Sequence, residues 1–342
     1  MERFNLYQQV RLAYERGRRL VAPLMGFPGI PLTRSTIKLA QQNYGEHYRV
    51  IAKIVETFGP DLVFPLMDLS VEANATGRYT IFPKDESATV PKESFSMEEL
   101  ERLQAVDIQK DTRLFGYVKT VRMMNERLPA HVVRGAYVTG PYTLAGLIMG
   151  SDDAALATLL NSDNLHRLVR FATDTIRQYA GYFMDVGAEL ICVLEPSAMM
   201  LGPKQFAEFS RDYVKEIAAD CHSRGVSSVY HVCGNSMHVI DRMVESGVDG
   251  ISIDSAESGV DIGKVIQSVP PDVVVVGNMN PVGTILNGFP SEVEQEAAEL
   301  LRIMDAYPNY ILSTGCDLPQ NVPSENILAL MQTGREHKIG SN

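Results

Sequence analysis

The sequence predicts an α/β protein that forms a single (β/α)8 barrel, the TIM barrel architecture, over residues 1–342. Eight short apolar runs rich in β-branched residues alternate with segments whose apolar residues recur at helical spacing. No G-x-G-x-x-G pattern follows any of these runs, which argues against an open Rossmann-like sheet. The length of 342 residues is common for a barrel that folds as one unit.

The elements follow one another regularly after an N-terminal amphipathic helix. The expected strands cover residues 20–25, 62–68, 131–138, 189–195, 226–233, 250–254, 273–277 and 310–314. The expected helices cover residues 1–18, 35–57, 97–127, 164–186, 204–223, 237–245, 261–267, 291–304 and 324–333. The segment 72–97 is rich in Gly, Pro, Thr, Ser and Lys, and it predicts an insertion after the second strand, built as a hairpin and loop.

Charge and composition narrow the class of protein. The net charge is −11 and no Lys/Arg-rich run is present, which argues against nucleic acid or an anionic membrane as the main partner. The longest uncharged stretch, 135–151, is interrupted by Pro141, and the N-terminus lacks the apolar core of a secretory signal. Four cysteines are too few for a disulfide framework in so long a chain. We therefore expect a cytoplasmic protein whose cysteines are reduced thiols or metal ligands.

Three residues have the spacing of a metal site. His231 and Cys233 are two residues apart at the end of one predicted strand, so their side chains leave the same face. Cys316 follows another predicted strand, where Gly315 allows a sharp turn. In one barrel these three would converge, and two thiolates with one imidazole suit Zn²⁺ while leaving a fourth position open for substrate. The alternative for each residue alone is an ordinary buried side chain.

Other polar residues also end predicted strands, namely Asp68, Glu195, Asp254 and Asn278. Chemistry in a (β/α)8 barrel lies at this end of the strands, so Asp68, Glu195 and Asp254 are candidate catalytic residues. Each could instead be a helix cap, and Glu195 could also be a fourth metal ligand.

Three residues are candidates for binding substrate. Asn278 ends one predicted strand and Met25 ends the first. Arg134 interrupts an apolar strand, where it would hold an anionic group in the lumen or pair with a buried acid.

Several motifs resemble the uroporphyrinogen decarboxylase superfamily. They are His-Val-Cys-Gly-Asn at 231–235, Gly-Asn-Met-Asn-Pro at 277–281, Gly-Pro-Tyr-Thr-Leu-Ala at 140–145, Ser-Thr-Gly-Cys at 313–316 and Pro-Ser-Glu-Asn at 323–326. His-x-Cys with the distal Gly-Cys is similar to the zinc-dependent corrinoid methyltransferases, of the methylcobamide:coenzyme M methyltransferase type. This resemblance implies a barrel that holds zinc through His231, Cys233 and Cys316. It also implies transfer of a methyl group between a small molecule and the cobalt of a separate corrinoid protein.

The sequence departs from this family pattern in both directions. Asp68 matches the pyrrole-binding Asp of the decarboxylases, but residues 25–30 lack their Arg, and Leu147 stands where they have Tyr. Glu195 precedes Pro196 where the coenzyme M enzymes have Asp. The small molecule therefore stays open: a thiol acceptor such as coenzyme M, or a methoxylated or methylated donor. The alternatives are a metal-free decarboxylase and a non-catalytic barrel whose structural zinc takes Glu195 or Cys192 as a fourth ligand.

Overall fold

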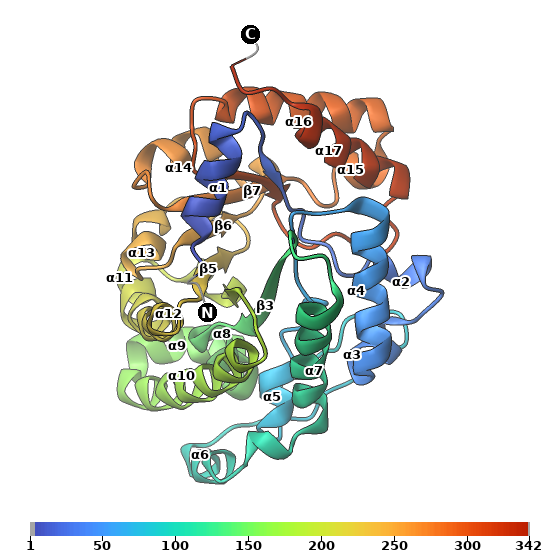
Figure 1. Ribbon diagram of the computed structural model, residues 1–342. Helices are drawn as coiled ribbons and strands as arrows, with labels where there is room; N and C mark the ends of the chain where they lie inside the picture. Colours follow the sequence, from blue (N-terminus) through green and yellow to red (C-terminus); the bar gives the residue numbers. More distant parts are fainter. Residues whose placement is uncertain (1–3, 341–342) are drawn as a thin grey trace.

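The computed structural model describes residues 4–340 and shows eight parallel strands around a central axis (Figure 1). The strands are β1 (Leu20–Val21), β2 (Leu62–Val63), β3 (Val133–Thr139), β4 (Leu190–Leu194), β5 (Ser227–Val232), β6 (Gly250–Ile253), β7 (Val274–Met279) and β8 (Tyr310–Thr314). Their order, β1-β8-β7-β6-β5-β4-β3-β2, is that of a (β/α)8 barrel. The predicted fold class is therefore confirmed.

The barrel is nearly closed between β1 and β2, the two strands at the ends of this order. At the amino-terminal end of this seam, the Asp61 N–H donates to the Val21 carbonyl (3.0 Å), and the Val21 N–H donates to Asp61 Oδ2 (2.8 Å). Both strands are shorter than predicted because Pro23 and Pro65 follow closely, and proline has no N–H for a ladder hydrogen bond.

Helices surround the sheet, as Figure 1 shows. They are α1 (Leu6–Glu15), α2 (Gly29–Leu32), α3 (Ile37–Gln42), α4 (Tyr44–Phe58), α5 (Val71–Ala75), α6 (Met97–Gln104), α7 (Thr112–Arg127), α8 (Pro141–Met149), α9 (Ser151–Leu160), α10 (Ser162–Asp185), α11 (Pro203–Phe206), α12 (Asp212–Ser223), α13 (Ile240–Glu245), α14 (Ile262–Ser268), α15 (Thr284–Asn287), α16 (Pro290–Met304) and α17 (Ser324–Glu336). Single-turn 3₁₀ helices cover Ile108–Lys110, Pro196–Met200 and Ala256–Ser258, and a π-helical turn covers Ala207–Arg211.

Two predicted helices are divided at caps, and a third, 204–223, is divided into α11 and α12 by the π-helical turn. The segment 35–57 forms α3 and α4, which meet at Asn43, and the Asn43 side chain caps α4 by accepting the Glu46 N–H at 3.0 Å. The segment 97–127 forms α6, a 3₁₀ turn and α7, which Asp111 caps in the same way. Apolar periodicity continues across such caps, so it predicted one helix where the chain forms two.

Two helices after β3 were not predicted. Helix α8 is buried on nearly all sides, so it lacks the polar face that produces a helical pattern in the sequence. Helices α8 and α9 meet at Gly150, whose φ of +100° a side chain would rarely adopt. The predicted insertion contains α5 and then a long loop with one antiparallel bridge, between Ile81 and Thr89.

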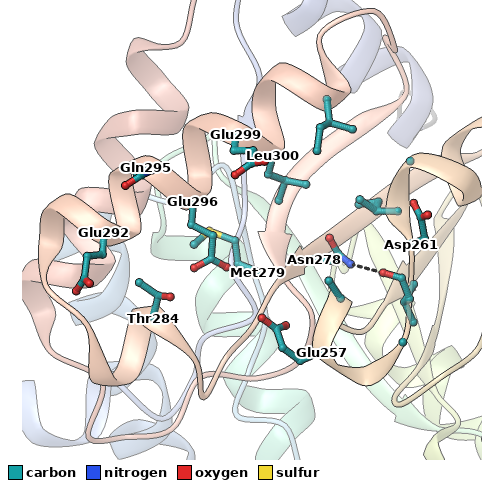
Figure 2. Close-up of a pocket in the computed structure, with 16 residues that line it drawn as sticks. Glu257, Asp261, Asn278, Met279, Thr284, Glu292, Gln295, Glu296, Glu299 and Leu300 are labelled. Carbon is teal, nitrogen blue, oxygen red and sulfur yellow. Dashed lines mark hydrogen bonds between the residues drawn. The ribbon is translucent and has the colours of Figure 1, made fainter.

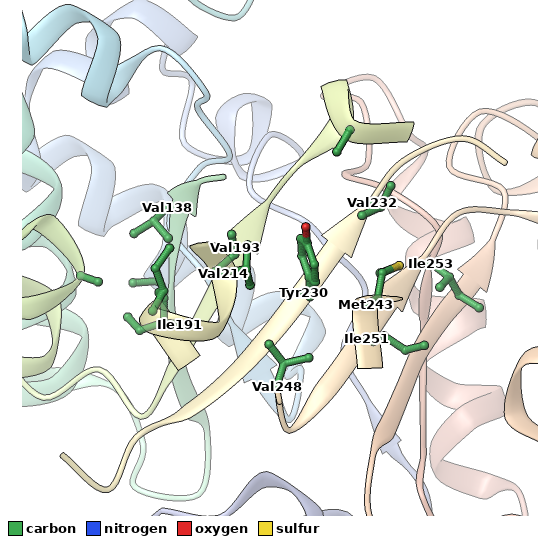
Figure 3. Close-up of a cluster of buried hydrophobic side chains, with 14 of the residues drawn as sticks. Val138, Ile191, Val193, Val214, Tyr230, Val232, Met243, Val248, Ile251 and Ile253 are labelled. Atoms are coloured by element: carbon green, nitrogen blue, oxygen red, sulfur yellow. The ribbon is translucent and has the colours of Figure 1, made fainter. Parts of the chain in front are cut away.

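Alternation along the strands divides the core into two parts. Inward side chains such as Phe64, Cys192 and Val276 fill the lumen, which α1 closes from below through Leu6. Outward side chains such as Ile191 and Tyr230 pack against the helices, and Figure 3 shows this layer. Polar side chains at the other end of the strands therefore lie above a filled barrel.

No single helix among residues 4–340 is both long and apolar enough to cross a membrane. Helices α8 and α9 reach that length and composition only as a pair, and they bend by 108° at their junction.

Candidate metal centre

Three soft ligands meet at the carboxyl end of the barrel. The His231 Nε2 atom lies 3.0 Å from the Cys233 sulfur, which lies 3.5 Å from the Cys316 sulfur. The ligand atoms of these residues all lie within 4.8 Å of one another, and this group could hold a metal ion. His231 is buried, whereas both cysteines are partly exposed. The structure thus brings together the three residues that the sequence spacing paired.

The local backbone explains this convergence. His231 lies in β5 and Cys233 follows its last residue, so the pleat directs both side chains to the lumen face. The chain then turns at Gly234, whose φ of +75° suits glycine. Cys316 follows β8 through Gly315, where a Cβ would lie 2.6 Å from the Ser255 nitrogen. Both cysteines therefore depend on glycine turns.

The pKa values of the two cysteines shift in opposite directions. Hydrogen bonds from Cys233 and His231 hold the pKa of Cys316 well below its ordinary value. The hydrogen bond to Cys316 and burial raise the pKa of Cys233. Two cysteine sulfurs and one imidazole nitrogen within 4.8 Å of one another are a ligand set that fits zinc.

Two residues of β6 and its following loop support this group. The Ser252 hydroxyl lies 2.9 Å from His231 Nδ1. Asp254 accepts the Gly234 N–H on Oδ2 (2.7 Å) and the Ser255 N–H on Oδ1 (2.6 Å). Sequence reasoning named Asp254 but missed Ser252. The signal was available, because Ser252 and Asp254 have the same spacing as His231 and Cys233.

Asn278 joins the centre to a neighbouring cleft. Its amide donates to the carbonyl of Asp254 (2.9 Å), and its side chain lines a cleft of about 820 Å³ between α14 and α16. Figure 2 shows Glu257, Glu296 and other acidic side chains around this cleft.

Glu195 lies outside the ligand group. Its side chain is fully buried against Gly140, and its Oε1 accepts the Thr143 N–H at 2.5 Å. Thr143 is in the first turn of α8, so the carboxylate lies at the N-terminus of that helix. Burial raises the pKa of Glu195 to about 8. Glu195 therefore bonds the first turn of α8, and its side chain makes no cap hydrogen bond to the helical turn that follows it, Pro196–Met200.

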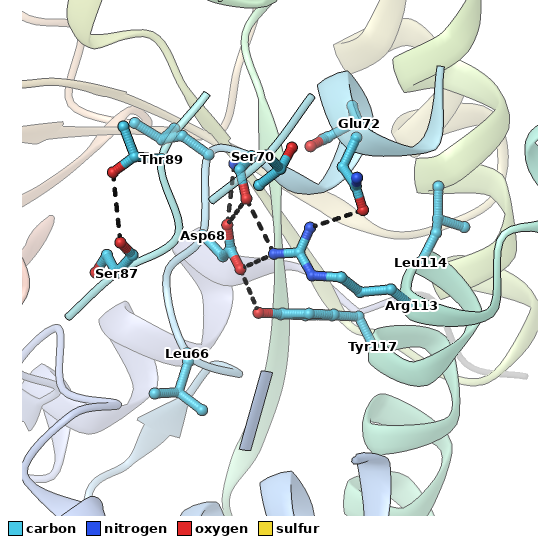
Figure 4. A network of polar contacts seen from close by, with 12 residues as sticks. Leu66, Asp68, Ser70, Glu72, Ser87, Thr89, Arg113, Leu114 and Tyr117 are labelled. Atoms are coloured by element: carbon cyan, nitrogen blue, oxygen red, sulfur yellow. Dashed lines mark hydrogen bonds and ion pairs between the residues drawn. The ribbon is translucent and has the colours of Figure 1, made fainter. Parts of the chain in front are cut away.

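Asp68 lies in a closed polar network on the other side of the barrel (Figure 4). It forms an ion pair with Arg113 and accepts the Tyr117 hydroxyl at 2.8 Å. Ser70 donates to it through its N–H (2.9 Å) and its hydroxyl (2.6 Å). Asp68 and Arg113 are both buried. Partners from the chain itself therefore occupy the Asp68 carboxylate.

The structure does not bring Arg134 to the metal ligands. Arg134 is near the start of β3, at the opposite end of the barrel, where its guanidinium pairs with Glu189 at 3.1 Å. An acid partner was the alternative that the sequence left open, and Arg134 has it.

Met25 lies at the carboxyl end of the barrel, on the same side as the metal ligands, but it is only 5% exposed and packs in the core. The following Gly26 N–H donates to Asp317, next to Cys316, at 3.2 Å. The backbone after Met25 therefore contacts the residue next to Cys316, but the Met25 side chain is buried, whereas Cys233 is partly exposed.

Comparisons with known proteins agree with this architecture. The chain is 26% identical over 246 residues to the methylcobamide:CoM methyltransferase MtbA of Methanosarcina acetivorans, which covers 71% of this chain and 69% of that protein. It is 23% identical over 304 residues to a uroporphyrinogen decarboxylase of Prochlorococcus marinus, covering 86% and 84%. The solved structure of a methyltransferase from Methanosarcina mazei superposes with a TM-score of 0.86 over 98% of both chains at 20% identity, which supports the same fold.

The sequence model of the uroporphyrinogen decarboxylase (URO-D) family matches residues 36–337. This match spans nearly all of the barrel, from α3 through α17. With the parallel eight-stranded sheet, it shows that the chain belongs to the uroporphyrinogen decarboxylase family.

Proposed function

We propose that this protein is a zinc-dependent methyltransferase that passes a methyl group between a small molecule and the cobalt of a separate corrinoid protein. The observation that carries the proposal is the convergence of His231, Cys233 and Cys316 within 4.8 Å at the barrel mouth. The methylcobamide:CoM methyltransferase relative supports the reaction class, since its name describes a methyl transfer from a corrinoid to a thiol.

The ligand group suits a catalytic metal better than a structural one. Among residues 4–340, the group contains three ligands, and neither Glu195 nor Cys192 belongs to it. Catalytic zinc sites have three protein ligands and keep a position for substrate, whereas structural sites are closed by four. Zinc bound here would lower the pKa of a substrate thiol and keep its sulfur nucleophilic.

The chain's own residues would bind and orient the reactants. With a thiol acceptor, its sulfur forms a bond to the methyl carbon as the carbon–cobalt bond breaks. The bonding pair stays on cobalt, and the thiol proton leaves to solvent. With a methylated donor, reduced cobalt attacks the methyl carbon, and the departing heteroatom keeps its electron pair and takes up a proton. The partly exposed cysteines face the mouth, where a corrinoid partner has access.

The other predicted site residues receive different weights. Asp254 contacts the turn that carries Cys233, so we retain it as a residue of the candidate site. Met25 and Asn278 end strands at the correct side, and we retain them as neighbours of the substrate site. Arg134 is bound to Glu189 at the far end of the barrel, and the proposal gives it no part in substrate binding.

A metal-free decarboxylase is the rival, favoured by the similarity to the Prochlorococcus marinus enzyme. In that reading Asp68 would hold the pyrrole N–H groups of the substrate. Here Arg113, Tyr117 and Ser70 already occupy the Asp68 carboxylate, and residues 25–30 offer no arginine for substrate carboxylates. These contacts count against the rival.

A direct test uses zinc-loaded protein with methylcobalamin and a panel of thiols, including coenzyme M. Loss of the methyl–cobalt absorbance with formation of the thioether is expected for the wild type and not for Cys316→Ser. The reverse assay offers reduced cobalamin with methoxylated or methylated donors. Zinc-loaded protein that catalyses neither direction, while metal-free protein decarboxylates uroporphyrinogen, would contradict the proposal.

A further inference from the structure

We infer that Ser252 and Asp254, in and just after strand β6, are positioning residues for the metal ligands: they hold His231 and the turn that carries Cys233, and Asp254 also packs against the turn that carries Cys316. This inference rests on the proposed function, because it assumes that His231, Cys233 and Cys316 bind metal.

Strand register places the two pairs opposite each other. Strands β5 and β6 are parallel, with His231 opposite Ser252 and Val232 opposite Ile253. Ile251 and Ile253 point outward into the helix layer (Figure 3), so alternation directs Ser252 toward the lumen. His-x-Cys on one strand therefore lies beside Ser-x-Asp on the next.

Ser252 fixes the imidazole of His231. Both side chains are 1% exposed, so the 2.9 Å contact between Nδ1 and the hydroxyl has no competition from solvent. If Nδ1 donates its proton to Ser252, Nε2 is left with a free lone pair on the side of Cys233. A histidine that binds metal through one nitrogen usually has the other held in this manner.

Asp254 fixes the turn that carries Cys233. Its carboxylate accepts the N–H of Gly234, the residue directly after Cys233, at 2.7 Å. Its other oxygen accepts the Ser255 N–H at 2.6 Å, which locks the carboxylate in place. The Asp254 carboxylate therefore supports a ligand without belonging to the ligand group.

The same residue also contacts the turn that carries Cys316. A Cβ at Gly315 would lie 3.0 Å from Asp254 Oδ1 and 2.9 Å from the Asp254 carbonyl carbon. The β8 turn can approach this closely only because Gly315 has no side chain. One short segment, 252–255, thus contacts the residues that place all three ligands.

The test measures zinc affinity by competition with a chelator in Ser252→Ala and Asp254→Asn. Partners of this kind contribute about 10- to 100-fold to metal affinity, and we expect a loss of that size in each variant. The absorption spectrum of the cobalt(II)-substituted protein should also change, since it reports ligand geometry, which a purely structural role would leave unaltered. Circular dichroism checks that each variant folds.

Ser227→Ala is the matched control. Ser227 is a buried serine of β5 whose hydroxyl accepts the Leu6 N–H at 3.0 Å, far from the ligands. We expect its zinc affinity to equal that of the wild type. Variants of Ser252 and Asp254 that bind zinc as tightly as this control would overturn the inference while leaving the methyl-transfer proposal intact. A wild type that binds no zinc would overturn both.

Discussion

Polar residues lie at the ends of the strands on two sides of the barrel mouth, but the two sides differ in what these residues contact. On the β2 side, Asp68 is enclosed by Arg113, Tyr117 and Ser70. On the β5 side, Cys233 and Cys316 contact His231 and each other and stay partly exposed. On the β2 side, donors from the chain itself satisfy the Asp68 carboxylate, so this network is part of the folded structure. On the β5 side, the cysteine sulfurs stay partly exposed, so they can bind a metal or a substrate.

Removing the Arg113 guanidinium should produce the largest change in stability. Arg113→Ala leaves the Asp68 carboxylate buried without its ion-pair partner, which typically costs about 3–5 kcal/mol. Denaturant unfolding would measure this loss, and zinc content should not change. Arg170→Ala removes an exposed guanidinium that pairs with Glu216 at 2.7 Å, and it should cost at most about 1 kcal/mol. Equal costs in the two variants would show that the β2 network is not a buried anchor.

Glu72 should make the β2 side sensitive to pH. Burial raises the pKa of Glu72 to about 7, and Thr139 donates to it through its N–H at 2.7 Å. Because the folded pKa lies above the unfolded value, the contribution of Glu72 to stability is greatest in acid and declines as pH rises toward 7, by up to about 3 kcal/mol.

The Glu72→Gln variant isolates this effect. Its unfolding free energy, compared with that of the wild type at pH 5 and pH 8, should gain about 3 kcal/mol at the higher pH. A difference between the two proteins that does not change with pH would contradict this account of Glu72.

Gly234→Ala should affect the β5 side in two ways. The φ of +75° costs a side chain about 1–2 kcal/mol, and the turn that holds Cys233 should lose zinc affinity as well. Gly247→Ala is the control, with a φ of +77° and nothing within 4 Å of the added Cβ. The control should lose the part of the stability that depends on φ, without the 3.1 Å contact that a Cβ at Gly234 makes with Met199, and it should retain full zinc affinity. Full zinc affinity in Gly234→Ala would show that the turn does not position Cys233.

Arg134→Gln should have the smallest effect. The substitution breaks a partly buried ion pair with Glu189 at the far end of the barrel, which costs about 1 kcal/mol. Zinc content and methyl transfer should equal those of the wild type. A large loss of activity with little loss of stability would return Arg134 to the substrate site.

The barrel and the pair His231 and Cys233 were accessible from the sequence because their patterns are local, whereas Cys316, 83 residues beyond Cys233, could be added only through the predicted barrel. Eight apolar runs mark the strands, and a two-residue spacing puts His231 and Cys233 on one face. The side to which the Glu195 side chain points could not be predicted from the sequence. It depends on where β4 ends, since neighbouring residues of a strand point to opposite faces, and on the position of α8, a helix with no polar face. Two of the partners of Asp68, Arg113 and Tyr117, lie more than 40 residues away in the sequence, so no local pattern names them.

Ser252 shows what a pairwise reading of strands adds. Its spacing from Asp254 repeats the spacing of His231 and Cys233 in the sequence, and the register of β5 and β6 then places Ser252 opposite His231. Arg134 shows the converse, because an arginine in an apolar strand has two physical solutions, and only the structure places it at the end with Glu189.

The measurement that tests this account most directly is the zinc content of purified protein. We expect about one zinc per chain in the wild type and in Cys192→Ala, and almost none in His231→Ala, Cys233→Ser or Cys316→Ser. Circular dichroism would confirm that all of the variants fold. No zinc in the wild type after zinc is added back, or zinc retained in all three ligand variants, would contradict the account.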